Sequence, residues 1–508
     1  SGQRNVAVGF NAQLETTVGD SNIAIGYQAM LGDGAFQNDN NIAIGSSNPD
    51  GTLAAMGGQW ATAASSNNVA IGVGTMTGVM NAANNNVAVG YLALKVLVGG
   101  EDNVALGVGA GSKITEGNGN VLIGNNCGDG LSGSHYNIAI GQNALGSSTT
   151  VVEGSVIIGY GAGLGALEAG ANNTVAIGRS ALAALISGAG NTAIGYQAML
   201  EHETGDGNTA IGHGAMKDSL GSLANANNTF IGYLSGSGTW LSSASTENVV
   251  IGSSTMTGAM NGCSNNSIVG FAAGQSLTTG DSNVALGSAA GNALTAGSSN
   301  IAIGRNALLV HNTGSQNIAI GHGAMDDTDA GGTSRASGDN IFIGFDAGGG
   351  TWANVASTHN VAIGNTAMDA VMNGALSNTS VGYDSLGALT SGDENVAIGR
   401  AAGNSITAGK KNICIGAEAN VSDPVDNQIS IGYSCNTSGQ YSIAIGNDIT
   451  TEVANQTVIG SGGVFKLLSK EYTVDHSDDE NARAASSEAS PLKIPAYSII
   501  KSVSAIVT

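Results

Sequence analysis

Cysteine is scarce in this sequence and lacks the spacing of a disulfide framework or a zinc site. The four cysteines, Cys127, Cys263, Cys414 and Cys435, form no CxxC pair, which is the usual mark of a structural zinc site. Three of them stand where the repeat described below has a small residue, so we interpret them as small buried side chains. We expect no disulfide, no metal site and no cofactor.

Basic residues and long apolar runs are also missing. The chain has 15 Lys and Arg against 37 Asp and Glu, a net charge of −22, and its basic residues form no patch. This excludes ordinary nucleic-acid binding, which requires neutralised phosphates. No run approaches the length of a transmembrane helix, so we expect no membrane insertion. No non-repeating cluster of nucleophile, base or paired carboxylates appears, so we expect no enzyme; carboxylates paired in grooves between subunits are the alternative.

Glycine is abundant instead, with 80 in 508 residues, about twice the average share. It closes a pentapeptide, Asn22-Ile23-Ala24-Ile25-Gly26, that recurs in 26 copies from Asn5–Gly9 to Gln456–Gly460. A strict aliphatic register excludes a disordered glycine-rich chain. The commonest interval is about 17 residues, and repetition at so short a period predicts a solenoid whose coils bury a core only by stacking.

The pentapeptide has two unlike faces, which we number from the repeat glycine. Position −1 is Ile, Val or Leu in all 26 copies and −3 is mostly Val or Ile, whereas −4 is Asn in 21 copies and −2 is usually Ala. Side chains alternate along a strand, so −3 and −1 share one face and −4 and −2 the other. We expect the bulky face to fill the coil, and the Asn/Ala face to form an amide ladder and a contact surface for other subunits.

Each coil is completed by a second segment and a polar loop. Segments such as Tyr27-Gln28-Ala29-Met30 predict a second short strand, with a small inward slot at position +3. The fold class is therefore all-β, a parallel β-solenoid of about 26 coils over residues 1–460, forming a rod on the order of 120 Å long. Residues 461–508 lack the repeat and predict a neck and the opening strands of a C-terminal β domain. The chain starts inside a repeat and ends in a strand-like run, so we expect further domains outside it.

The repeat resembles the head of trimeric autotransporter adhesins, the YadA-like β-roll. Tyr441-Ser442-Ile443-Ala444-Ile445-Gly446 fits the core of that family, and the last three repeat glycines, Gly432, Gly446 and Gly460, follow one another at its shorter interval. The resemblance covers about residues 1–460 and implies a left-handed β-roll and a homotrimer. Most intervals here are longer, and neither a coiled-coil stalk nor a membrane-barrel anchor follows.

Longer units are similar to repeats in bacteriophage tail-fibre and appendage proteins. The octapeptide Asn22–Ala29, NIAIGYQA, recurs closely at Asn191–Ala198. This resemblance implies a virion fibre or spike that acts as a rigid trimeric spacer in host attachment, in contact with other virion proteins and with a host glycan or protein. A bacterial surface adhesin head and a self-contacting structural filament are the alternatives.

Three cassettes interrupt the regular repeat. The only tryptophans, Trp60, Trp240 and Trp352, each occupy position −12 before a repeat glycine, and methionines follow that glycine at +4 and +8. One hypothesis is a binding loop formed by these tryptophans with Met76, Met256 and Met368, because Trp is a favoured interface anchor. The alternative, which we favour, is that Trp and Met pack a long loop onto the roll.

Aromatic residues also recur directly after the repeat glycine, in ten coils from Phe10 to Tyr433. A column of aromatic side chains along one edge could bind a glycan. A packing stripe that stiffens the rod is the alternative, and we favour it.

Overall fold

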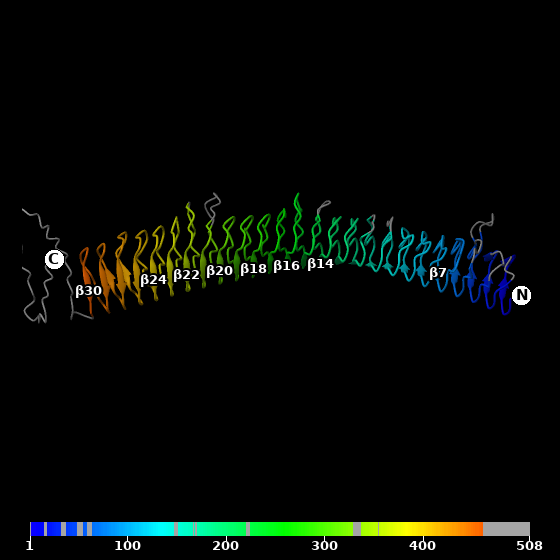
Figure 1. The fold of residues 1–508 in the computed structure, drawn as a ribbon, viewed down its shortest axis with the longest axis horizontal. Helices are drawn as coiled ribbons and strands as arrows, with labels where there is room; N and C mark the ends of the chain where they lie inside the picture. The colour runs from blue at the N-terminus through cyan, green and yellow to red at the C-terminus, as the bar shows by residue number, and fades with distance from the viewer. Residues whose placement is uncertain are drawn as a thin grey trace, which may run out of the picture. The chain divides into compact units, whose positions relative to one another are not determined.

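The computed structural model describes residues 2–460 except 15–17, 32–36, 48–53, 58–62, 147–150, 166, 168–169, 220–223, 329–336 and 354. Within these residues the chain is all-β, with 30 short strands and no helix. Twenty-six of the strands form one parallel sheet along the stack, with loops on the other side of each coil (Figure 1). The predicted β-solenoid is confirmed.

Each strand of this sheet covers positions −3 to −1 of one repeat. The strands are β1 (Val6–Val8), β3 (Ile23–Ile25), β5 (Ile42–Ile44), β6 (Val69–Ile71), β7 (Val87–Val89), β8 (Val104–Leu106), β9 (Val121–Ile123), β10 (Ile138–Ile140), β11 (Val156–Ile158), β12 (Val175–Ile177), β13 (Thr192–Ile194), β14 (Thr209–Ile211), β15 (Thr229–Ile231), β16 (Val249–Ile251), β17 (Ser267–Val269), β18 (Val284–Leu286), β19 (Ile301–Ile303), β20 (Ile318–Ile320), β21 (Ile341–Ile343), β22 (Val361–Ile363), β23 (Thr379–Val381), β24 (Val396–Ile398), β25 (Ile413–Ile415), β27 (Ile429–Ile431), β29 (Ile443–Ile445) and β30 (Thr457–Ile459).

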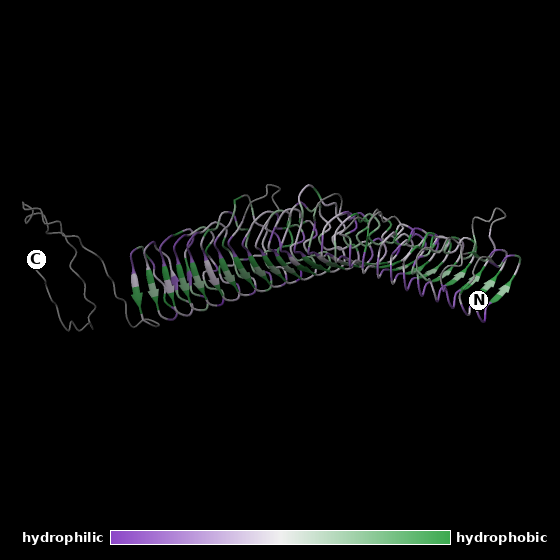
Figure 2. Cartoon of the chain, turned by 45° about the vertical axis from the view of Figure 1, so that its right-hand side comes forward, coloured by the Kyte–Doolittle hydropathy of each residue, from purple (hydrophilic) through white to green (hydrophobic). Residues whose placement is uncertain are grey.

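Neighbouring strands pair without any slip in register. Ala193 of β13 lies opposite Ala210 of β14, and the same repeat position faces itself in the other pairs of this sheet. Loop insertions between coils do not disturb this pairing, because Ile42 of β5 still lies opposite Val69 of β6 although the loop between these two strands is much longer than most. Figure 2 shows the resulting band of apolar strands beside more polar loops.

The repeat glycine makes the corner at the end of each strand. At Gly195, φ is +139°, and a Cβ would lie 2.4 Å from the carbonyl oxygen of Gly212 in the next coil. Only glycine allows both this backbone conformation and this approach. The predicted role of the glycine is confirmed.

A second strand in every coil was a wrong prediction. Outside the main sheet, the described residues contain only two small pairs, β2 (Gln13–Leu14) with β4 (Met30–Leu31) and β26 (Asn420–Val421) with β28 (Asn436–Thr437). In most coils the segment after the glycine is a turn with left-handed residues, such as Gln197 (φ 55°) and Met199 (φ 51°). Its small slot at +3 is confirmed, because Ala198 is fully buried.

The expected orientation of the strand faces is also wrong. Ala193 at −2 and Asn191 at −4 have no exposed surface, whereas Thr192 and Ile194 on the other face are partly exposed. The interior of a coil is narrow, and it is filled by Leu or Met at position +4 and Leu or Ile at +7, such as Leu94 and Leu97. Only a small side chain at −2 fits opposite them. The Asn/Ala face therefore cannot be a contact surface for another subunit.

The chain divides into two units, Ser1–Leu467 and Leu468–Thr508. The first contains the whole solenoid. The predicted neck and C-terminal β domain, residues 461–508, lie outside the described residues.

Candidate functional site: an exposed aliphatic face and its two edges

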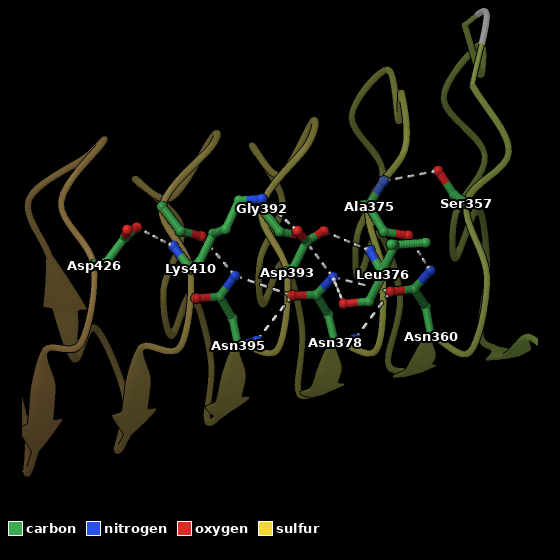
Figure 3. A network of polar contacts seen from close by, with 11 residues as sticks. Ser357, Asn360, Ala375, Leu376, Asn378, Gly392, Asp393, Asn395, Lys410 and Asp426 are labelled. Atoms are coloured by element: carbon green, nitrogen blue, oxygen red, sulfur yellow. Dashed lines mark hydrogen bonds and ion pairs between the residues drawn. The ribbon is translucent and has the colours of Figure 1, made fainter.

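Inside the roll, the asparagines at −4 form the predicted ladder. In Figure 3, Asn360, Asn378 and Asn395 stack on consecutive coils. The Oδ1 of Asn378 accepts bonds from the backbone N–H and the Nδ2 of Asn395, at 2.9 and 3.0 Å. Its own Nδ2 donates to the carbonyl of Gly392 at 2.8 Å. Both the Nδ2 and the Oδ1 of this fully buried amide are therefore hydrogen-bonded. A polar group can be buried in a core at little cost only when its hydrogen bonds are satisfied in this way.

The ladder is continuous over long stretches. Backbone N–H to side-chain bonds link every −4 residue from Asn191 to Gln428. Ser155 and Thr174 interrupt the series with shorter hydroxyl side chains. Because each bond joins two coils, the ladder stabilises the stack along its length.

Outside the roll, positions −3 and −1 form two columns of aliphatic side chains on the sheet. We call this surface the aliphatic face. Val249 and Ile251 of β16 are 42% and 37% exposed, and Val284 and Leu286 of β18 are 37% and 47% exposed. The other strands of the sheet repeat this arrangement, with partly exposed Val, Ile or Leu at −1 and occasional Thr or Ser at −3. The alternation of side chains along the strand correctly predicted that positions −3 and −1 share one face. The prediction that this face fills the interior was wrong.

Two further columns flank the aliphatic face, one at each end of the strands. The residue at −5 precedes the strand in a left-handed conformation, with φ between 55° and 62° at every non-glycine example, such as Tyr136 and Glu247. The residue at +1 follows the repeat glycine and includes the ten predicted aromatic residues, of which Tyr160 and Tyr233 are about half exposed. We call these columns the −5 edge and the +1 edge.

Rings on the +1 edge stack on one another between coils. The ring of His213 lies between those of Tyr196 and Tyr233, with centroids 5.0 and 5.3 Å away. The guanidinium of Arg179 lies between the rings of Tyr160 and Tyr196, at 5.6 and 6.0 Å. Since these ring faces contact each other or a cation, they are not free to stack on sugars. The geometry favours the stiffening stripe over the glycan track.

The tryptophan cassettes pack inward. Trp240 and Trp352 are only 2% exposed, and Met76, Met256 and Met368 are fully buried. The Trp240 ring contacts Phe230 at 5.6 Å, and its Nε1 donates to the carbonyl of Gly236 at 3.1 Å. Trp352, Phe342 and Gly348 repeat this arrangement. At these two positions the projecting binding loop was the wrong hypothesis, because the long loop needs a large side chain to fill it. Trp60 lies outside the described residues.

Carboxylates gather on the turns of four consecutive coils. Asp326, Asp346, Asp369 and Asp384 follow one another along the stack, and His322 Nδ1 lies 3.7 Å from Asp346. Partial burial raises the pKa of Asp369 to about 6, and the negative charges of Asp346, Asp326 and Asp384 add to this effect. Like charges therefore destabilise this part of the rod at neutral pH.

Two buried histidines were missed from the sequence. His202 and His311 occupy the +7 position, where other coils have Leu or Ile, and both are almost fully buried. His202 Nδ1 lies 3.2 Å from the Ser219 hydroxyl, and its Nε2 lies 3.4 Å from Asn208 Nδ2 in the ladder. Burial lowers the pKa of His202 to about 4, so the ring is neutral at pH 7. Their +7 spacing from Gly195 and Gly304 was the available signal.

Among the described residues, no group of three or more His, Cys, Asp or Glu is placed to hold a metal ion. The four cysteines are free and buried. In the same part of the chain, no helix is long and apolar enough to cross a membrane.

The fold and its surface define this chain as a parallel β-solenoid repeat protein. No protein-family model matches it, and no curated protein matches it either.

Proposed function

We propose that the chain forms the shaft of a homotrimeric rod, in which the aliphatic faces of three copies meet around an axis parallel to the stack. The observation that carries this proposal is the exposed aliphatic face itself. With two side chains on each of 26 strands, its exposed apolar area is on the order of 2,000 Å². The largest apolar patch on an ordinary monomer is about 300–600 Å².

Such an area matches that of a stable protein interface, about 1,200–2,000 Å² in total. The face is also continuous along the sheet, because its strands form one 26-stranded sheet, so a neighbouring copy can follow it from coil to coil. The resemblance to trimeric adhesin heads supports three copies. The Asn/Ala residues, which we first assigned to this contact, are instead the interior of each roll.

We further propose a structural role for this rod, that of a rigid spacer in the appendage of a phage virion used in host attachment. Support comes from the resemblance of the NIAIGYQA units to phage fibre repeats and from the continuous amide ladder, which resists bending between coils. Surface acidity keeps a long repetitive rod soluble. The role needs no catalytic residue, and its partners are the other copies and neighbouring virion proteins.

Light scattering on the purified chain tests whether it forms a trimer. Electron microscopy tests whether the trimer is located in the virion appendage. The expected mass is three times the 49.8 kDa of one chain. Gold-labelled antibodies against the chain should decorate virion appendages. A monomeric mass would contradict the assembly, and labelling confined to the bacterial surface would replace the virion role with that of an adhesin.

A further inference from the structure

A cyclic assembly brings the two edges of the aliphatic face together in a defined way. Rotation about an axis parallel to the stack does not change the height of a coil, so each coil meets the same coil of the neighbouring copy. Around a closed ring the contact is head to tail. The +1 edge of one copy therefore approaches the −5 edge of the next.

The two edges are complementary in size in some coils. Three coils have a large ring at +1 and glycine at −5, namely Tyr160 with Gly154, Tyr196 with Gly190, and His213 with Gly207. In the other nine coils with a ring at +1, the −5 residue is Arg, Asn, Asp, Gln or Ser. Where a ring occurs at −5 instead, the +1 residue is a linear amide: Tyr136 with Gln142, His359 with Asn365, and Tyr441 with Asn447. No coil in the repeat sequence carries rings on both edges.

The glycines at −5 are not all required by their own chain: Gly119 is, because a Cβ there would lie 2.8 Å from the Tyr136 ring of the next coil, whereas Gly190 is not. At Gly190, φ is +67°, close to the 58° that Tyr136 adopts at the equivalent position. A Cβ built on Gly190 meets no atom within 4 Å, so the space beside it is open in a single copy. At Gly154 and Gly207 a Cβ would lie 2.7 and 2.9 Å from the side-chain oxygen of an asparagine in the next coil, which would have to move aside. At Gly190, contacts within the chain do not account for glycine.

Charge is complementary in one coil as well. Glu394 lies on the −5 edge and Arg400 on the +1 edge of the coil that contains β24, and both are exposed. Arg400 also pairs with Glu418 of its own chain. In-register contact brings Arg400 of one copy toward Glu394 of the next.

We propose that copies of this chain interlock edge to edge and in register, with the +1 rings of one copy packed over the −5 glycines of its neighbour. This inference rests on the rod of the proposed function. The aliphatic face alone cannot set the height of one copy against another, because a slip of one coil replaces Val or Ile with Val or Ile. The −5 and +1 edges differ from coil to coil and can therefore fix the register between copies. A single polar residue in the core of a coiled coil fixes register in the same way.

Paired cysteines test the contact on the full chain. In Gly190→Cys with Tyr196→Cys, the two thiols of one copy lie at opposite ends of a strand, at most roughly 20 Å apart, and a bismaleimide bridge within one copy would leave the chain at its monomer mass. The four native cysteines are buried and give little background. The displaced control is Gly190→Cys with Phe271→Cys, four coils apart. The expected result is a covalent trimer on denaturing gels for the first pair and uncrosslinked chains for the control.

A bulky substitution gives an independent readout. Gly190→Tyr should lower the melting temperature of the assembly by roughly 2–4 °C, because the neighbour's ring already fills the space. Adding Tyr196→Asn should restore it by reproducing the pairing of Tyr441 with Asn447. A trimer that neither cross-links in register nor responds to Gly190→Tyr would overturn this inference but not the proposed function. A monomer would overturn both.

Discussion

Acid should loosen the rod around His202, and His202→Leu should remove this effect. The histidine occupies the +7 position, where the preceding coil has Leu185, and it is buried against Ser219 and Asn208. Its neutral form suits this site, where Nδ1 lies beside the Ser219 hydroxyl and Nε2 lies beside both the Asn208 amide and the Gly205 carbonyl. A charged imidazole would turn an N–H toward the Asn208 Nδ2 and would be desolvated.

The size of the effect follows from the depressed pKa, about 4 in the folded chain against 6.5 unfolded. The unfolded coil binds more protons between these values, so stability falls as the pH decreases from about 6.5 to 4. From pH 7 to pH 5 the loss is about 2 kcal/mol, and by pH 4 and below it approaches about 3 kcal/mol. At pH 5 the coil should therefore open roughly 20 times more often.

Hydrogen exchange measures this opening, after correction for the intrinsic pH dependence of exchange. The backbone N–H of Met199, which donates to Ala215 in the next coil, is a suitable reporter. His202→Leu should abolish the excess opening at pH 5, whereas His359→Leu, at an exposed histidine, should leave it unchanged. The reasoning fails if wild type and His202→Leu show the same pH dependence, or if His202 titrates near pH 6.5 in NMR spectra.

Three further substitutions test the interior and the turns. Trp240→Ala should lower stability by about 3–5 kcal/mol in thermal or denaturant unfolding, because it empties the site beside Phe230; lost host binding with unchanged melting would instead revive the binding hypothesis. Asn378→Ala should cost about 2–4 kcal/mol by removing the acceptor of the buried Asn395 amide, whereas the exposed Asn125→Ala should cost little; equal effects would argue against the ladder. Asp369→Asn should stabilise the coils around position 369 at pH 7, and in the wild type these coils, unlike those around His202, should gain stability from pH 7 to 5 because the folded pKa of Asp369 is raised to about 6; a local loss on acidification that disappears in Asp369→Asn would contradict the like-charge account.

The repeat sequence predicts the path of the chain well, because each local requirement recurs in every coil. Glycine at the corner is needed where Gly195 meets the backbone of Gly212, and this requirement appears directly as a period. The in-register sheet follows from that period. The amide ladder could be predicted because a stack of identical coils places Asn378 directly between two other asparagines.

The direction of the two strand faces could not be predicted from alternation, because alternation groups the side chains without saying which group is inside. Bulk favoured the aliphatic residues, yet the interior is narrow and already holds the residues at +4 and +7. One signal was available. Where −2 is large, as at Phe230, position +4 becomes glycine, and a Cβ on Gly236 would lie 2.4 Å from the Phe230 ring. That exchange of volume indicates that −2 and +4 share the interior.

The −5 and +1 edges could be found in the sequence only in part. Rings at +1 were visible, but their stacking depends on coil spacing, and the role of Gly190 appears only once its surroundings are seen to be open. The tryptophan cassettes were visible in the sequence, but their role could not be predicted from it. A rare large residue in a long loop suggested recognition, whereas Trp352 and Phe342 pack together inside the coil.

The most direct test of the account is the accessibility of a single cysteine on the aliphatic face. Ile251→Cys replaces a side chain that is 37% exposed in one chain, and Ser242→Cys places a matched thiol on an exposed loop of the same region. In the native assembly, the account predicts that the thiol at position 251 reacts with maleimide at least about 100-fold more slowly than the one at 242, and that both react alike after unfolding. Equal rates in the native protein would show that the aliphatic face is bare and would contradict the central claim.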